Sequence, residues 1–203
     1  MHTSFPEEAL QSKCLKIVHE ILDAQYVCIF IKNFALIEDD ETKTSHVKCT
    51  ISFSNEWKDI FIEGVGYGMV DALFNSMMKK FTKDFSSLSQ LEFDDFAMQV
   101  KFKNLLATKT DAPVEIKIAL TNKQGQRIYF SSEARSMVVA AISAIRKAFE
   151  YLINAERAFL HLQKDIENAA ERNRVDLAKT YTNQMATLVR VLSYEEVVKK
   201  HID

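Results

Sequence analysis

The most distinctive chemical feature of this 203-residue sequence is a cluster of three glycines, Gly64, Gly66 and Gly68, within one pentapeptide. Glycine allows positive φ and lets another group approach the main chain closely. A helix that begins directly after such a turn offers free N–H groups to a carboxylate or a phosphate. The cluster therefore predicts either an anion-binding turn or a tight turn that needs glycine for its geometry alone.

The sequence around the cluster narrows the class of ligand. No Gly-Lys-Ser/Thr follows it, which excludes a P-loop, and the GxGxG spacing differs from that of the dinucleotide fingerprint. The neighbouring segments alternate like antiparallel strands rather than like a βαβ unit. A small-molecule carboxylate is the ligand that fits best.

Other residues that could do chemistry form no recognisable pattern. The five histidines are scattered, and the pair His161 and Asp165 supplies too few ligands for a metal ion. The acidic groups 39–41 and 94–95 are interpreted as solvated loop or strand-edge residues. No HxH, HExxH or GxSxG motif occurs. We therefore expect a protein that is not an enzyme and uses no metal and no cofactor.

Composition and charge exclude several classes of partner. The net charge is −2 and the pI is near 6.2, so there is no basic footprint for nucleic acid or anionic lipid. Three widely spaced cysteines form neither a disulfide framework nor a metal knuckle. The beginning of the sequence lacks a signal-peptide pattern, and the longest apolar run near it, 26–31, is too short for a membrane span. We expect a cytoplasmic protein without a nucleic-acid or membrane partner.

The elements that must position the glycine cluster follow from hydrophobic periodicity, and they occur in the same order twice. Residues 6–23 predict an N-terminal helix. The first set of elements is predicted as strands over 26–34, 46–53 and 58–63 and a helix over 69–81. The second set is predicted as strands over 93–102, 114–120 and 127–131 and a helix from about residue 136.

A shift of 68 residues aligns the two sets. It places Ile60-Phe61-Ile62 on Ile128-Tyr129-Phe130, and Met69-Val70 on Met137-Val138. We interpret this as a duplicated βββα unit with pseudo-twofold symmetry, because each unit leaves one sheet face that the other can cover. The predicted fold class is α+β, with antiparallel three-stranded sheets, an N-terminal helix and a C-terminal helical extension.

The pattern after the second unit stays helical to the end. Residues 150–174 contain no Gly or Pro, and apolar residues then recur at spacings of three and four from Ala178 to Leu192. Ser193 and Glu196 form a capping box that predicts a short last helix. We expect this tail to pack on its own domain, with a partner-binding or dimerising arm as the alternative. The predicted division is a helix in 1–25, a domain in 26–153 and an extension in 154–203.

The run Gly-Tyr-Gly-Met-Val-Asp-Ala-Leu at 66–73 resembles the G-x-G-P-V-D-A-L signature of a known family. This family is the C-terminal regulatory (allosteric dimerisation) domain of α-isopropylmalate synthases and citramalate synthases. Thr110-Asp111-Ala112 is similar to the family's T-D-A, and the aromatic-led strand around Phe96 matches in position. The resemblance covers about residues 26–153 and implies the same βββα-βββα fold.

The resemblance implies a non-catalytic domain that binds leucine or isoleucine near a dimer interface and regulates a TIM-barrel catalytic domain in leucine biosynthesis. The residues before the domain are too few for such a barrel. We therefore expect a free-standing homodimer that senses a small branched-chain amino acid or keto acid and modulates a separately encoded synthase. The ligand-binding positions carried over are, in the turn and helix start, Gly66, Tyr67, Gly68, Val70 and Asp71, and, in the facing wall, Phe96, Val100 and Ala112.

The sequence departs from the family pattern at the turn. Tyr67 replaces a small polar residue and Met69 replaces proline, and both are bulky enough to fill the pocket or change its specificity. The corresponding turn of the second unit, 133–136, has no glycine, so no equivalent second site is expected. The alternative function is a protein–protein interaction or scaffold module that kept the dimer fold and lost ligand binding.

Overall fold

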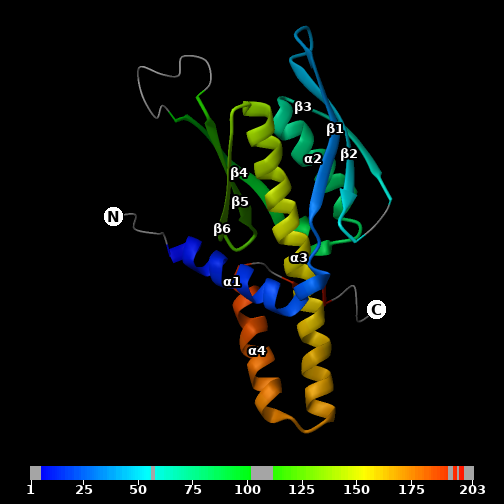
Figure 1. Ribbon diagram of the computed structural model, residues 1–203, viewed down its shortest axis with the longest axis vertical. Helices are drawn as coiled ribbons and strands as arrows, with labels where there is room; N and C mark the ends of the chain where they lie inside the picture. Colours follow the sequence, from blue (N-terminus) through cyan, green and yellow to red (C-terminus); the bar gives the residue numbers. More distant parts are fainter. Residues whose placement is uncertain (1–5, 56–57, 102–111, 192–193, 196, 199–203) are drawn as a thin grey trace.

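The computed structural model describes residues 6–55, 58–101, 112–191, 194–195 and 197–198. Its elements follow the order βββα-βββα, with a helix before the first unit and another after the second (Figure 1). Their bounds are α1 Pro6–Leu22, η1 Asp23–Gln25, β1 Ile29–Asp39, β2 Thr44–Phe53, β3 Ile60–Gly66, α2 Met69–Phe81, η2 Ser86–Gln90, β4 Leu91–Val100, β5 Val114–Asn122, β6 Arg127–Ala134, α3 Met137–Glu171 and α4 Val175–Val189.

The strands form two antiparallel three-stranded sheets, in the orders β1-β2-β3 and β4-β5-β6. Helices α2 and α3 lie between the two sheets (Figure 1). Helix α2 packs on β2 and β3, whereas α3 packs on β5 and β6, so each helix covers the inner face of its own sheet. The predicted α+β fold of two βββα units is confirmed.

Apolar side chains recur at every second residue of the central strands, and this alternation determines which face of each sheet is buried. In β2 the apolar side chains from Val47 to Phe53 alternate toward the helices, and in β5 Ile116, Ile118 and Leu120 do the same. The ring of Phe74 on α2 contacts Phe93 of the second unit at 5.2 Å. The two units therefore share one hydrophobic core.

The first strand differs from its prediction over 26–34, because residues 26–28 cross α3 before the strand begins. The N–H of Val27 donates to Asn154 Oδ1 at 2.9 Å, and its C=O accepts from Asn154 Nδ2 at 2.8 Å. These side-chain bonds replace a strand partner. β1 then continues to Asp39 through a bulge at Asn33, whose φ is +50°.

The C-terminal tail packs on its own domain. α3 has 35 residues and continues past residue 153, and α4 runs back along it to α1, so that the two helices form a projecting hairpin (Figure 1). The hairpin is anchored at its base, where Asn122 Nδ2 donates to the Val191 carbonyl at 2.9 Å and Tyr194 stacks on Phe159 at 4.3 Å.

Several expectations fall on residues that the structure does not describe. Ser193 and Glu196 of the predicted capping box, and Thr110 and Asp111 of the T-D-A motif, lie outside the described ranges. Within those ranges, no helix is long and apolar enough to cross a membrane. The same ranges hold no cluster of three or more His, Cys, Asp or Glu side chains that could bind a metal ion.

Candidate functional site

The glycine cluster lies where β3 passes into α2. Gly64 and Gly66 are the last part of β3, and Gly68 is the residue directly before the helix. The first helical hydrogen bond runs from the Ala72 N–H to the Gly68 carbonyl at 2.9 Å. The N–H groups of the three residues between them therefore have no acceptor inside the helix.

Two of the three glycines are required by packing of the strand against the helix. A Cβ at Gly66 would lie 2.5 Å from the Ala72 nitrogen, and one at Gly64 would lie 2.7 Å from the Ser76 Cβ. A Cβ at Gly68 would meet nothing within 4 Å. Of the described glycines, only Gly125 has a positive φ. Close approach of α2, rather than turn geometry, thus explains the first two, and Gly68 borders open space.

We expect these glycines to respond differently to the same substitution. Gly66→Ala should lower the free energy of unfolding by about 1–3 kcal/mol, because the new methyl group clashes with helix backbone. Gly68→Ala should change it by less than about 0.5 kcal/mol, because the site is open and its φ of −174° suits any residue. Urea denaturation of the two variants measures the difference. Equal losses would contradict the packing explanation.

Asp71 closes the turn with its carboxylate. Its Oδ2 accepts from the Tyr67 N–H at 3.0 Å, and its Oδ1 accepts from Asn75 Nδ2 at 2.6 Å. The side chain of Tyr67 is 90% exposed and lies outside the core. Of the predicted turn residues, Asp71 therefore has a structural role that its sequence position did not reveal.

The predicted facing wall lies on the other sheet. Phe96 and Val100 are in β4. Both lie on the face of the sheet that carries the buried Ile118, the residue that pairs with Phe96. Phe96 is 42% exposed and Val100 is 39% exposed. Ala112 is half-buried just before β5. The Phe74–Phe93 contact holds the start of β4 against α2. Within the described residues, no hydrogen bond joins this wall to the turn.

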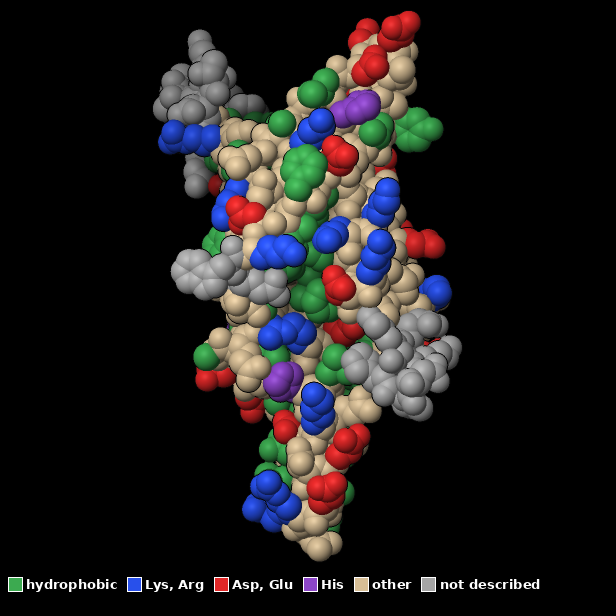
Figure 2. All heavy atoms as spheres, turned by 90° about the vertical axis from the view of Figure 1, so that its right-hand side faces the viewer, with side chains coloured by type: hydrophobic (Ala, Val, Ile, Leu, Met, Phe, Trp, Pro, Cys, Tyr) green, Lys and Arg blue, Asp and Glu red, His purple; other side chains and the backbone are tan. Residues whose placement is uncertain are grey.

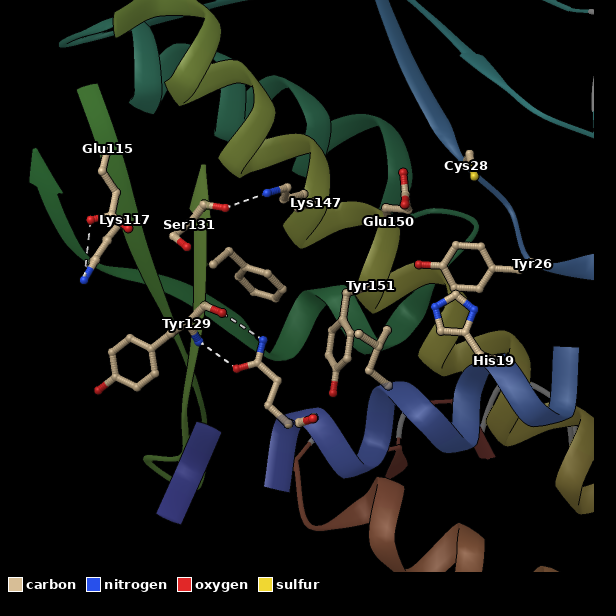
Figure 3. A pocket seen from close by; sticks show the side chains of 14 residues that line it. His19, Tyr26, Cys28, Glu115, Lys117, Tyr129, Ser131, Lys147, Glu150 and Tyr151 are labelled. Carbon is tan, nitrogen blue, oxygen red and sulfur yellow. Dashed lines mark hydrogen bonds and ion pairs between the residues drawn. The ribbon is translucent and has the colours of Figure 1, made fainter. Parts of the chain in front are cut away.

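A separate concave site, which no local sequence pattern predicts, lies between α1, β6 and α3 (Figure 3). Its volume is about 780 Å³. Leu15 and His19 of α1 line one side at a spacing of four residues, and Lys147 and Tyr151 of α3 line another at the same spacing. Each pair follows ordinary helical periodicity, so only the tertiary arrangement reveals the cavity.

Polar side chains fix the walls of this cavity. The Gln11 amide accepts from the Tyr129 N–H at 3.1 Å and donates to its carbonyl at 2.8 Å, as a neighbouring strand would. Lys147 Nζ donates to the Ser131 carbonyl at 2.8 Å. Figure 3 shows these contacts along β6, with the His19–Tyr26 ring stack on the opposite side.

The two phenols of the cavity have raised pKa values, so they stay protonated even at pH values where an exposed tyrosine begins to ionise. Desolvation by burial is the main cause. It raises the pKa of Tyr151 well above its usual value. Burial, together with the nearby Glu150 carboxylate, raises the pKa of Tyr26 to about 12. Both rings therefore serve as neutral walls with hydrogen-bonding tips.

Comparison with known protein families gives one match. The family described as the LeuA allosteric (dimerisation) domain matches residues 12–153, which is more than half of the chain. The matched region begins in α1, includes both βββα units and the glycine cluster, and ends within α3. A search of curated proteins found no match.

Proposed function

The chain belongs to the LeuA allosteric (dimerisation) domain family, and from this premise we propose that it binds a small branched-chain amino acid or a related carboxylate. The site we propose is the turn at Gly68, close to the interface of a homodimer. The domain is regulatory in type, and its binding would modulate a separately encoded synthase in the cytoplasm as part of leucine biosynthesis. It carries out no reaction itself.

The observation that carries this proposal is the glycine cluster inside the matched region. Packing accounts for Gly64 and Gly66 but leaves the open position at Gly68 without a structural reason. The three free N–H groups at the start of α2 suit a carboxylate, since the helix dipole also favours negative charge there. The branched side chain of the ligand would then extend toward Val70 and the exposed apolar residues of β4.

Titration of candidate ligands into the protein tests the proposed site at the turn. We expect leucine, isoleucine, valine or a matching 2-keto acid to bind the wild-type chain in calorimetry, and Gly68→Val to weaken binding at least tenfold. The extended backbone at Gly68 accepts valine, so the variant keeps its fold while its side chain occupies the open space. Ala97→Val adds similar bulk on the outward face of β4 and serves as the control. Equal affinities of the two variants would contradict the proposal.

The second candidate function is a scaffold that retains the dimer and binds no small molecule. It is favoured by Asp71, whose carboxylate is already occupied by the turn, and by the α3–α4 hairpin, which extends beyond the family match. Val175 at the tip of this hairpin is 78% exposed. A folded dimer that binds none of these ligands at millimolar concentration would favour this second function.

A further inference from the structure

The cavity between α1, β6 and α3 has an apolar floor and a polar edge. Leu15, Phe130 and Tyr151 form the floor, and the last two are almost fully buried with their rings 5.7 Å apart. The edge is strand β6. A volume of about 780 Å³ falls in the range of small-molecule sites, which are mostly apolar with a few placed polar groups.

The free edge of β6 directs hydrogen-bond donors into this cavity. Both main-chain groups of Tyr129 bind Gln11, so they point away from β5. Because the direction repeats every second residue, the N–H and C=O of Ser131 point the same way. The Ser131 carbonyl binds Lys147. The Ser131 N–H therefore lies along the edge between the Gln11 amide and the Lys147 ammonium group.

The charges around the cavity leave one cation without a carboxylate partner. Glu150 is bound by Arg146 at 2.7 Å and by the Ile29 N–H at 3.0 Å. Glu115 lies 3.3 Å from Lys101 and 3.8 Å from Lys117. Among the described residues, no carboxylate lies within ion-pair distance of Lys147, which donates to the Ser131 carbonyl instead.

We propose that this cavity binds a small monocarboxylic acid with a branched aliphatic or aromatic body, at a site distinct from the Gly68 turn. The carboxylate binds Lys147 and the N–H of Ser131, and the body lies on Leu15 and Phe130. The site favours keto acids over amino acids, because both lining glutamates are already paired and none is left for an ammonium group. A bound acid joins α1 to β6 and α3, and so fixes the N-terminal helix on the core.

The half-buried Cys28 lines the same cavity and provides a direct readout (Figure 3). Cys14 and Cys49 are buried, and burial raises the pKa of each thiol to about 11, so both should resist alkylation and serve as internal references. We expect 4-methyl-2-oxopentanoate to slow the alkylation of Cys28 by iodoacetamide in a saturable way. Leucine, which has the same carbon skeleton, should protect at least tenfold less well.

Variants of the full chain, with affinity measured in parallel by calorimetry, make the test decisive. Lys147→Gln should weaken the binding of 4-methyl-2-oxopentanoate by about tenfold or more, because a charge-assisted bond is lost. Lys79→Gln removes the exposed lysine at the equivalent position of the first unit and should change nothing at this site. Phenyl phosphate, tested in the same assay, shows whether the site is specific for a carboxylate or accepts any anion with an apolar body.

Three results would overturn the proposal: no protection of Cys28 at 10 mM acid, equal protection in the two lysine variants, or equal or stronger protection of Cys28 by leucine or phenyl phosphate. Gly68→Val separates this site from the proposed effector site, since it should leave the protection of Cys28 intact. Loss of effector binding with intact protection would thus concern the Gly68 turn alone.

Discussion

Replacing Asn154 by leucine is expected to lower the free energy of unfolding by about 3–5 kcal/mol. The side chain is fully buried and binds both main-chain groups of Val27, while its Nδ2 also donates to the Glu150 carbonyl at 2.8 Å. Leucine has nearly the same volume, but it leaves the N–H and C=O of Val27 without partners. Each unpaired buried group costs about 1–3 kcal/mol.

Denaturant unfolding of the variant measures this loss. Asn168→Leu, at an exposed position on the same helix, is the matched control and should stay within about 0.5 kcal/mol of wild type. A loss of less than 1 kcal/mol for Asn154→Leu would show that Asn154 does not hold the segment between α1 and β1 on α3.

Replacing Met98 by glutamate is expected to weaken the homodimer at least 100-fold. Met98 is 51% exposed on β4, yet it lies on the inner face and pairs with the buried Ile116. With its neighbours Phe96 and Val100, it extends the core surface to where no described element covers it. An apolar strip of this kind suits a dimer interface, and a charge buried there without a partner opposes association.

Sedimentation equilibrium checks this expectation. Ala97→Glu places the same charge one residue away, on the opposite face of β4 and beside Lys117, and should leave the dimer unchanged. If Met98→Glu and Ala97→Glu dimerise equally well, the inner face of β4 is not part of the interface.

The surface also offers other exposed apolar side chains. Figure 2 views the face that carries the sheet β1-β2-β3, with hydrophobic side chains in a recess along its middle and Lys and Arg side chains around them. Phe30 and Phe61 on this sheet are at least half exposed. These exposed aromatic side chains offer a second surface on which a dimer could form, so the variants of β4 are compared with a control on the same strand.

Much of the fold could be predicted from the sequence, because local patterns agree with the tertiary structure. Helix α2 has the predicted bounds, since its apolar stripe is bordered by Gly68 and by the end of that stripe at Phe81. Ser136 lies at the predicted start of α3 and caps the helix, its Oγ accepting from the Val139 N–H. Such signals depend on neighbours in the chain, so one sequence suffices to read them.

Other features depend on contacts that are distant in the sequence. The shift of β1 requires Asn154, which lies 127 residues from Val27. β3 continues through Gly66 rather than ending near residue 63, because the absence of side chains lets it lie close on α2. A motif alone does not distinguish a glycine that contacts a ligand from one that contacts a helix.

The comparison of the two units concerns only their own elements. The second unit lacks glycines at its turn, so no site equivalent to the Gly68 turn is expected there. The cavity beside Lys147 is of another kind, because α1 adds a wall that no repeat pattern contains. Sequence symmetry describes the elements of a unit and not what packs against its edge.

Backbone amide shifts in two-dimensional ¹H–¹⁵N spectra test the central claim most directly. Leucine, isoleucine, valine and their 2-keto acids are titrated into the labelled chain, with its dimeric state verified by sedimentation. The account predicts that at least one of them produces saturable shifts at residues 68–72, where the free N–H groups of α2 lie. A folded dimer whose amides at 68–72 do not shift at 10 mM of any of these ligands would contradict it.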